Sequence, residues 1–390
     1  MPDPSDLPIA KPVVKEPTVT KAPPAGRKFP CPQCGARLDF DPSERGLKCP
    51  YCGYHRDIKR DDHAEVAERD YQDYLTREEG KGKAIEGRST ETKCTGCGAV
   101  VLIEDKVATE RCPFCGTHLE TRPEAARAMI PPESLLPFSV DLHIARDAFQ
   151  KWLEGLWFAP NELKRAAALG QLTGVYLPFW TYDAMTYTFY DGQRGDDYQE
   201  TEWYTETLPD GRTERRSRTV TRTRWTSVSG EVQHFFDDVL VCASRSLPAD
   251  LIDDLGHWHL EKLEPFQPDF LSGFKTERYA VGLKDGFRIA KELMQPTIDR
   301  LICEDIGGDH QRIDGQRTRY SAVTFKHLLL PVWVAVYRYQ DKTYQVLVNG
   351  RTARVTGYRP YSWWKIAGLA ALIALVVALI AILVMVLGGR

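Results

Sequence analysis

The chain has 390 residues, a length that fits two or three domains. Charged residues make up 27% and hydrophobic residues 43%, and 51 Lys and Arg against 54 Asp and Glu leave a net charge of −3. These values exclude a uniformly basic nucleic-acid coat, a mostly disordered chain and a chain that lies mostly inside a membrane.

The N-terminal segment is rich in proline, since eight of the 25 prolines lie within residues 1–30. Charged and threonine residues are interleaved with them, so the segment has little apolar surface to offset the entropy of ordering. It also lacks the apolar stretch of a secretory signal. We predict that residues 1–28 form a flexible, disordered segment.

Eight of the ten cysteines follow the Pro-rich segment in a duplicated pattern. Each set contains two Cys-x-x-Cys-Gly motifs with 14 residues between the inner cysteines, and the second set lies 63 residues after the first at every position. The eight cysteines are Cys31, Cys34, Cys49, Cys52, Cys94, Cys97, Cys112 and Cys115. The repeat predicts two small modules of one kind, at residues 29–57 and 91–120.

The chemistry of these motifs points to metal. Each Cys-x-x-Cys turn aims two thiolates at one ion, and the glycine after it supplies the conformational freedom that the turn needs. Four thiolates without histidine or carboxylate are typical of a closed, structural Zn²⁺ site, although iron takes the same ligands. We predict two zinc ribbons, each too small to fold without its metal.

Basic residues surround both predicted ribbons: Arg37, Arg45, Lys48, Arg56, Lys59 and Arg60 near the first, and Lys93, Lys106 and Arg111 near the second. They could form a nucleic-acid-binding surface. Acidic residues are interleaved with them, which favours a solvated or protein-binding surface instead. Residues 58–90 between the ribbons have a charged helical pattern from Ala64 to Glu79 and predict a helical spacer.

Residues 131–360 have the pattern of an α+β domain with a mainly antiparallel sheet and flanking helices. Ser139 or Asp141 can cap a first helix, and a short second helix is predicted from Pro160 to Gly170. A helix over Leu283 to Ile306 is expected to be interrupted at Pro296. Strands are predicted over residues 323–339, 343–348 and 354–358.

A long β-hairpin is predicted to turn at Pro209-Asp210-Gly211. Side chains alternate along a strand, so acidic residues share one face of the outgoing strand and arginines share one face of the return. These residues are Glu200, Glu202 and Glu206, and Arg212, Arg216, Arg218, Arg222 and Arg224. A loop of three or five residues makes the two faces meet and neutralise each other. The alternative is an arginine strip for nucleic acid or lipid, with Arg222 and Arg224 lying beyond the acidic stretch.

Two segments of this domain echo each other. Leu177-Pro178-Phe179-Trp180 is matched by Leu330-Pro331-Val332-Trp333, and each runs on into an aromatic β-pattern. The similarity suggests two copies of one β-module, and two ordinary buried strands are the alternative.

The C-terminal stretch Ile366 to Leu387 contains no charged or strongly polar residue. A helix of this length spans about 33 Å, which matches a bilayer core of about 30 Å, and Trp363, Trp364 and Lys365 suit its edge. A buried core helix is the alternative. More basic residues precede the span than follow it, so we predict a single-pass, tail-anchored protein of the inner membrane with its N-terminal bulk in the cytoplasm. A reducing compartment disfavours disulfides.

No sequence motif of a known catalytic class is present: there is no phosphate-binding loop, nucleophile elbow or His-Glu-x-x-His motif. His257 and His259 could contribute to a metal site, but they lack a third ligand at clear spacing and are interpreted as surface residues. Cys242 and Cys303 are interpreted as buried small apolar residues. We predict a protein that is not an enzyme.

Several motifs together resemble a bacterial family of membrane-anchored proteins with a ribbon like that of transcription factor IIB. They are Phe29-Pro30-Cys31 through Leu38, Leu47-Lys48-Cys49 through Gly53, Leu136-Pro137-Phe138, Gly174 through Ala184, Leu263-Glu264-Pro265-Phe266, Leu271-Ser272-Gly273-Phe274 and Val348-Asn349-Gly350-Arg351-Thr352. Members often carry a label likening them to primosomal protein N′ (replication factor Y), a helicase, but no motor motif is present in this chain. The resemblance implies partners of the SPFH (stomatin-like) or phage-shock type. Many members have one ribbon where this chain has two.

The sequence therefore predicts a zinc-binding, tail-anchored adaptor that recruits protein partners at the membrane. A membrane-tethered nucleic-acid-binding protein of replication or primosome type is the second hypothesis, and an enzyme with an unrecognised site is the third.

Overall fold

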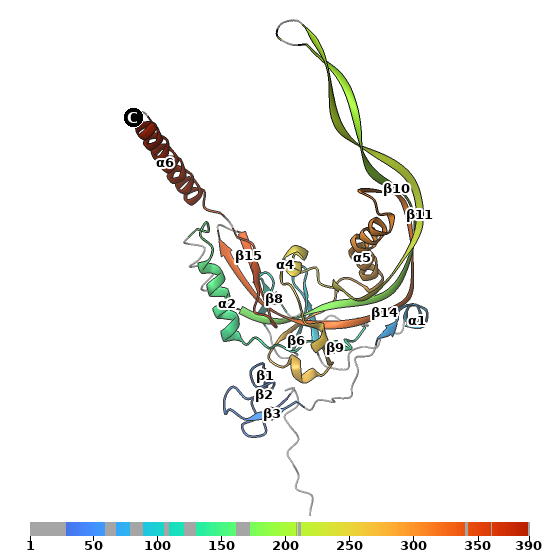
Figure 1. Cartoon of the computed structure of the whole chain (residues 1–390). Coiled ribbons are helices and arrows are strands. Elements are labelled where there is room, and N and C mark those ends of the chain that lie inside the picture. The colour runs from blue at the N-terminus through green and yellow to red at the C-terminus, as the bar shows by residue number, and fades with distance from the viewer. Residues whose placement is uncertain are drawn as a thin grey trace, which may run out of the picture.

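The computed structural model describes residues 29–58, 68–78, 89–104, 109–120, 130–160, 172–207, 209, 212–339, 342–359 and 361–388. The predicted segment 1–28, most of the short helix predicted after Pro160, and residues 59–67 and 79–88 of the predicted spacer lie outside these residues. The described part is a mixed α+β structure built on a mainly antiparallel sheet (Figure 1).

Two long strands form the centre of this sheet. β10 (Leu172–Thr207) pairs antiparallel with β14 (His310–Tyr339) over its first two thirds. β15 (Lys342–Asn349) pairs antiparallel with β14, and β16 (Val355–Gly357) pairs antiparallel with β15. Shorter strands extend the edges: β4 (Arg69–Asp70), β9 (Ser134–Leu135), β12 (Glu264–Pro265) and β13 (Lys275–Glu277).

The predicted hairpin is present and consists of two long strands. β10 runs without interruption through the stretch between Tyr190 and Glu200, and it pairs with β11 (Thr213–Cys242) from Phe179 to Thr207. Thr207 lies opposite Thr213, which corresponds to a five-residue loop and brings the predicted faces together. β14 begins opposite Gly195, so the hairpin continues beyond it as a two-stranded ribbon (Figure 1).

The two echoed segments lie side by side at the centre of the sheet. Leu177 is the register partner of Leu330, and the strands run in opposite directions, so the segments are related by an approximate two-fold axis. The indole N–H of Trp180 donates to the carbonyl of Val281, and that of Trp333 donates to the carbonyl of Val140. Each tryptophan thus fastens a connecting segment to the sheet.

Helices cover the sheet at separate places. α5 (Leu283–Ile306) packs into the curve of β10, β11 and β14 and continues through Pro296 rather than stopping there. Its buried face holds the helix together across the missing backbone donor. α1 (Tyr71–Glu78) packs Tyr71 and Tyr74 against Phe325 of β14. α2 (Leu142–Glu154) begins at Asp141, whose carboxylate accepts from the N–H of Ile144, and α4 (Ala249–Asp254) lies near β16.

The first four-cysteine module, residues 29–58 (module 1), folds around its own small sheet. Its strands are β1 (Asp39–Asp41), β2 (Gly46–Lys48) and β3 (His55–Asp57). The short helix η2 (Pro268–Leu271) holds it: the rings of Phe40 and Phe270 lie edge to face, and the Phe40 N–H donates to the carbonyl of Ser272. Module 1 shares a hydrophobic core with Tyr176 and Trp333 on one face of the main sheet.

The second four-cysteine module, residues 89–104 and 109–120 (module 2), is part of the main sheet. β5 (Ser89–Lys93) pairs with β6 (Val100–Glu104), which in turn pairs with β13, while β7 (Thr109–Arg111) pairs with β8 (His118–Glu120). Its buried side chains join a core with Val175 and Leu177, which alternate with Tyr176 along β10. The two modules therefore cover opposite faces of the same sheet.

α6 (Trp363–Gly388) projects away from the rest of the molecule (Figure 1). It is long and apolar enough to cross a membrane, and none of its most apolar window is buried against the protein. The alternative of a buried core helix is therefore wrong. The expected span, Ile366 to Leu387, falls within this helix.

Candidate functional site

Four turns of one design build the two candidate metal centres. In each turn, the N–H of the first cysteine donates to the carbonyl of the residue five positions after it. The N–H of the glycine four positions after that cysteine donates to the carbonyl of the cysteine. These glycines are Gly35, Gly53, Gly98 and Gly116, with φ between 71° and 77°. This conformation strains residues that have a Cβ, so the glycine after each motif serves the turn as predicted.

The turns bring all eight predicted ligands into two clusters of four. Within each cluster the sulfur atoms lie within 4.8 Å of one another. The Sγ atoms of Cys31 and Cys52 are 3.5 Å apart, and those of Cys97 and Cys112 are 3.6 Å apart. A Zn²⁺ ion bound at about 2.3 Å by four tetrahedral thiolates would hold its ligands about 3.8 Å apart. The clusters thus fit a single four-coordinate ion each.

The protein itself changes the acidity of these thiols. The pKa of Cys49 is lowered to about 6 because the backbone N–H of Cys52 donates a hydrogen bond to it. The pKa of Cys112 is raised by its hydrogen bond with Cys97 and by burial. Metal binding requires deprotonated thiols, and a divalent cation held at the centre would supply the attraction that favours thiolate at the buried positions.

The two centres differ in their exposure. Cys34 and Cys52 of module 1 are exposed, whereas all four cysteines of module 2 are buried or half-buried. Tyr51 in the turn of module 1 is 83% exposed, whereas Phe114 at the same place in module 2 is 0% exposed. The carbonyl of Phe114 also accepts from the side-chain amide of Gln345 on β15. The second turn of module 2, at residues 112–115, is therefore buried in the protein, whereas the equivalent turn of module 1, at residues 49–52, faces solvent.

The basic residues of module 1 have acidic neighbours. Arg37 lies 2.7 Å from Asp39, Lys48 lies 2.6 Å from Glu44, and Arg56 lies 2.9 Å from Asp269 of η2. Lys59, Arg60 and Lys106 lie outside the described residues. Much of the predicted cationic surface on module 1 is therefore neutralised within the protein.

A group of exposed aromatic side chains surrounds the start of α6. Trp363 and Trp364 are 81% and 89% exposed, and Trp157, which is distant in sequence, is 81% exposed. The Ser362 N–H donates to the carbonyl of Phe158, and the Lys365 ammonium donates to that of Ala159. These bonds hold Trp157 beside the helix, a placement that its sequence position did not indicate.

The hairpin shows the predicted neutralisation. Arg218 lies 2.9 Å from Glu202, and Arg216 lies 2.9 Å from Glu206. The interpretation of Arg222 as lying beyond the acids is wrong, because it bonds both Glu200 at 2.6 Å and Glu202 at 2.5 Å. The twist and pairing of the ribbon let one guanidinium reach two acids of the neighbouring strand.

Besides the two cysteine clusters, one cluster of acidic residues in the described part of the chain has side chains close enough to share an ion: Asp183, Asp237 and Asp238. It lies where β10 shifts register against its neighbours. Asp183 accepts from the Asp238 N–H and from the Thr324 hydroxyl, and Asp238 lies 2.7 Å from the Lys326 ammonium. These donors and the lysine charge stabilise the carboxylates, so we interpret the group as one that stabilises a bend in the sheet.

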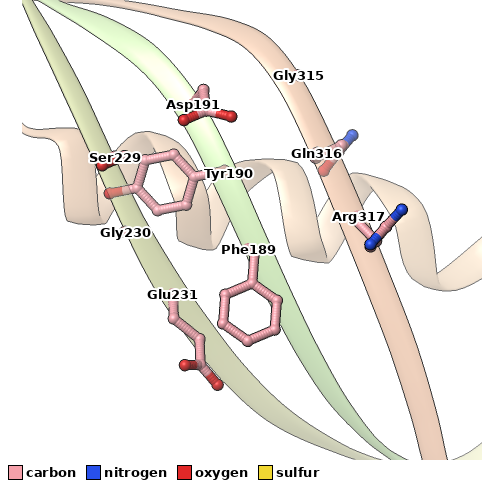
Figure 2. Close-up of a pocket in the computed structure, with 9 residues that line it drawn as sticks. All are labelled: Phe189, Tyr190, Asp191, Ser229, Gly230, Glu231, Gly315, Gln316 and Arg317. Atoms are coloured by element: carbon pink, nitrogen blue, oxygen red, sulfur yellow. The ribbon is translucent and has the colours of Figure 1, made fainter.

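A hollow of about 690 Å³ lies on β10, β11 and β14 at the base of the hairpin (Figure 2). Nine residues line it: Phe189, Tyr190, Asp191, Ser229, Gly230, Glu231, Gly315, Gln316 and Arg317. The Tyr190 hydroxyl passes Gly230, where a Cβ would lie 2.6 Å from it, and donates to Asp305 of α5. This lining contains no imidazole or thiol, so it holds no nucleophile–base pair of those types.

The remaining sequence candidates do not come together. His259 lies beside Glu261 and precedes a 3₁₀ turn, η1 (Leu260–Lys262), and the described groups with metal-binding geometry include neither His257 nor His259. Cys242 and Cys303 are half-buried.

The chain is 26% identical over 246 residues to the uncharacterized protein YdjG of Bacillus subtilis, and the aligned residues cover 62% of this chain and 68% of YdjG. No model of a known protein family matches the chain, and no solved structure matches it. The comparison names no activity, so function rests on the geometry described above.

Proposed function

We propose that this protein is a membrane-anchored adaptor. In this proposal two Zn²⁺ ions stabilise the four-cysteine modules as zinc ribbons, α6 crosses the inner membrane once, and module 1 recruits a protein partner on the cytoplasmic side. The protein acts by binding and positioning rather than by catalysis.

The exposed turn of module 1 carries this proposal. Tyr51 is a large aromatic residue that is 83% exposed, on a module docked to the body through Phe40 and Arg56. An exposed aromatic on a rigid support is typical of binding surfaces, because it buries a large area at low entropic cost. Module 1 also lies on the side of the body away from α6 (Figure 1). A partner from the cytosol would reach it without contacting lipid.

Charge and aromatic placement support the membrane arrangement. Arg359 and Lys365 precede the apolar stretch, in keeping with cytoplasmic placement of the body. Trp157, Trp363 and Trp364 surround the start of the helix at the level where indole rings prefer the lipid headgroups. With Trp157 in the headgroup region, the body would be held at a defined angle to the membrane.

A protein partner fits module 1 better than nucleic acid does. Three of its basic residues have acidic neighbours within the protein, so few counterions remain to be released on binding phosphates. The family resemblance implies a partner of the SPFH or phage-shock type.

Purification from intact membranes tests the proposal. Full-length tagged protein is extracted in detergent, and bound proteins, nucleic acid and metal are measured in the same sample. We expect about two zinc ions per chain and a specific protein partner that is lost with Tyr51→Ser. The matched control is Leu293→Ser, which removes a 52% exposed apolar residue on α5 and should keep the partner.

Two results would contradict the proposal. One is recovery of nucleic acid without any protein partner, with binding that weakens steeply as salt rises. The other is a partner that is retained equally by Tyr51→Ser and by wild type.

A further inference from the structure

Beyond its base, where Asp197 bonds Asp309 and His310, the outer part of the hairpin projects away from the rest of the described protein (Figure 1). It consists of residues 196–207 of β10 and 213–224 of β11, which we call the β-arm (Figure 1). At a rise of about 3.3 Å per residue, each of its strands is about 40 Å long. None of its residues is buried. Among the described residues, no third strand pairs with either of its edges. A two-stranded ribbon is only marginally stable in water, and open strand edges readily accept a further strand.

Its two faces differ in chemistry. On one face, β10 contributes a row of acids, Asp196, Glu200, Glu202 and Glu206, and β11 contributes a row of arginines, Arg216, Arg218, Arg222 and Arg224. The same face of β11 also carries Glu214, which lies opposite Glu206 and 3.2 Å from Arg216. The other face is mostly threonine, glutamine and serine, with Trp203 61% exposed beneath Arg215. Each β-arm therefore has a mainly acidic strand at one edge and a mainly basic strand at the other.

This arrangement decides which edges can meet. If β10 of one copy lay beside β10 of another with the charged faces aligned, acid would face acid, and two β11 edges would place arginine beside arginine. If β10 of one copy meets β11 of the next, every acid row lies between two arginine rows. Strand direction agrees with this choice: when two hairpins point the same way, β10 and the neighbouring β11 are antiparallel.

We propose that the β-arms of successive copies of this chain join edge to edge, β10 to β11, into a continuous sheet. The contact uses different edges on the two copies, so it adds copies in a ring or a row rather than closing as a two-fold dimer. If α6 of every copy crosses the same membrane, all copies have the same orientation and their effective concentration is raised. The inference does not depend on what module 1 binds.

A charge-swapped chain tests the proposal without breaking the hairpin. The variant carries Glu200→Arg, Glu202→Arg, Arg218→Glu and Arg222→Glu, so the pairs within its own hairpin remain complementary. Full-length wild-type and swapped chains with different tags are co-expressed, extracted in detergent and captured by one tag. We expect each chain to co-purify with its own kind, and recovery of the mixed pair to fall at least tenfold.

Other outcomes would overturn the proposal. Pairing of like edges would make the mixed pair the most abundant, and equal recovery of all pairs would show that these charges do not direct assembly. A wild-type chain that is monomeric or strictly dimeric by mass measurement would also contradict it. As a control, Arg300→Glu with Glu304→Arg reverses an ion pair on α5 and should leave co-purification with wild type unchanged.

A shortened chain provides an independent measurement. Joining Asp197 to Thr223 through Asn-Gly removes most of the β-arm and leaves a two-residue hairpin turn. We expect this variant to bind the same amount of metal and to unfold at the same temperature, but to be monomeric. Assembly equal to that of wild type would overturn the proposal.

Discussion

The two four-cysteine modules have the same motif and spacing, and they have different relations to the rest of the protein. Module 2 shares β6 with the main sheet and places Phe114 in its core, whereas module 1 keeps its own sheet and exposes Tyr51. A duplicated four-cysteine unit can therefore serve the fold in one copy and present a surface in the other. The following predictions test this difference, from the largest expected effect to the smallest.

Removal of the metal ligands should separate the modules most clearly. Cys94→Ser with Cys97→Ser should unfold much of the body, because metal binding contributes on the order of 10 kcal/mol to such a site and this site belongs to the main core. Cys31→Ser with Cys34→Ser should lose one metal ion and leave the central sheet folded. Bound metal and protection from protease in detergent measure both effects. Equal loss of protection in the two variants would show that the modules contribute alike.

The aromatic residues in the equivalent turns should differ in their effect on stability. Phe114→Ala removes a fully buried ring and should lower the free energy of unfolding by about 3–5 kcal/mol. Tyr51→Ala alters an exposed residue and should change it by less than about 0.5 kcal/mol. Chemical unfolding of the detergent-solubilised proteins compares them. A large effect of Tyr51→Ala would mean that module 1 uses this ring for folding.

Attachment of module 2 should depend on pH. Burial raises the pKa of Glu277 on β13 to about 7, although the Ser246 hydroxyl donates to it. A carboxyl whose pKa is higher in the folded state stabilises the fold when protonated, so this contribution should be lost as pH rises from about 4.5 through about 7. Glu277→Gln should remove that dependence and stabilise the protein more at pH 8 than at pH 5. Unfolding across this pH range provides the measurement, and an unchanged pH profile would argue against the assignment.

Attachment of module 1 should depend weakly on salt. Arg56 and Asp269 form a partly exposed pair, which contributes at most about 1 kcal/mol and is screened by ions. Arg56→Ala should increase hydrogen exchange within module 1 at low salt, with little change in the main sheet. The difference from wild type should shrink at high salt. Increased exchange throughout the sheet would indicate that module 1 is not a separate unit.

Local features were predictable from the sequence because nearby residues determine them. The two clusters of four cysteines, the glycines that follow each motif and the apolar C-terminal helix all depend on short spacing or composition. Asp141 as a helix cap and the meeting of Glu202 with Arg218 follow from the same short-range rules. Alternation along the strands determined which faces of the hairpin would meet.

Only the tertiary structure decided what these features contact. Tyr51 and Phe114 occupy equivalent sequence positions, but one faces solvent and the other faces β15, because burial depends on residues more than 200 positions away. Trp157 reaches the start of α6 for the same reason, through bonds of residues 158 and 159 to residues 362 and 365. The length of the β-arm likewise depends on where β14 begins, and the local sequence pattern of β10 does not indicate that position.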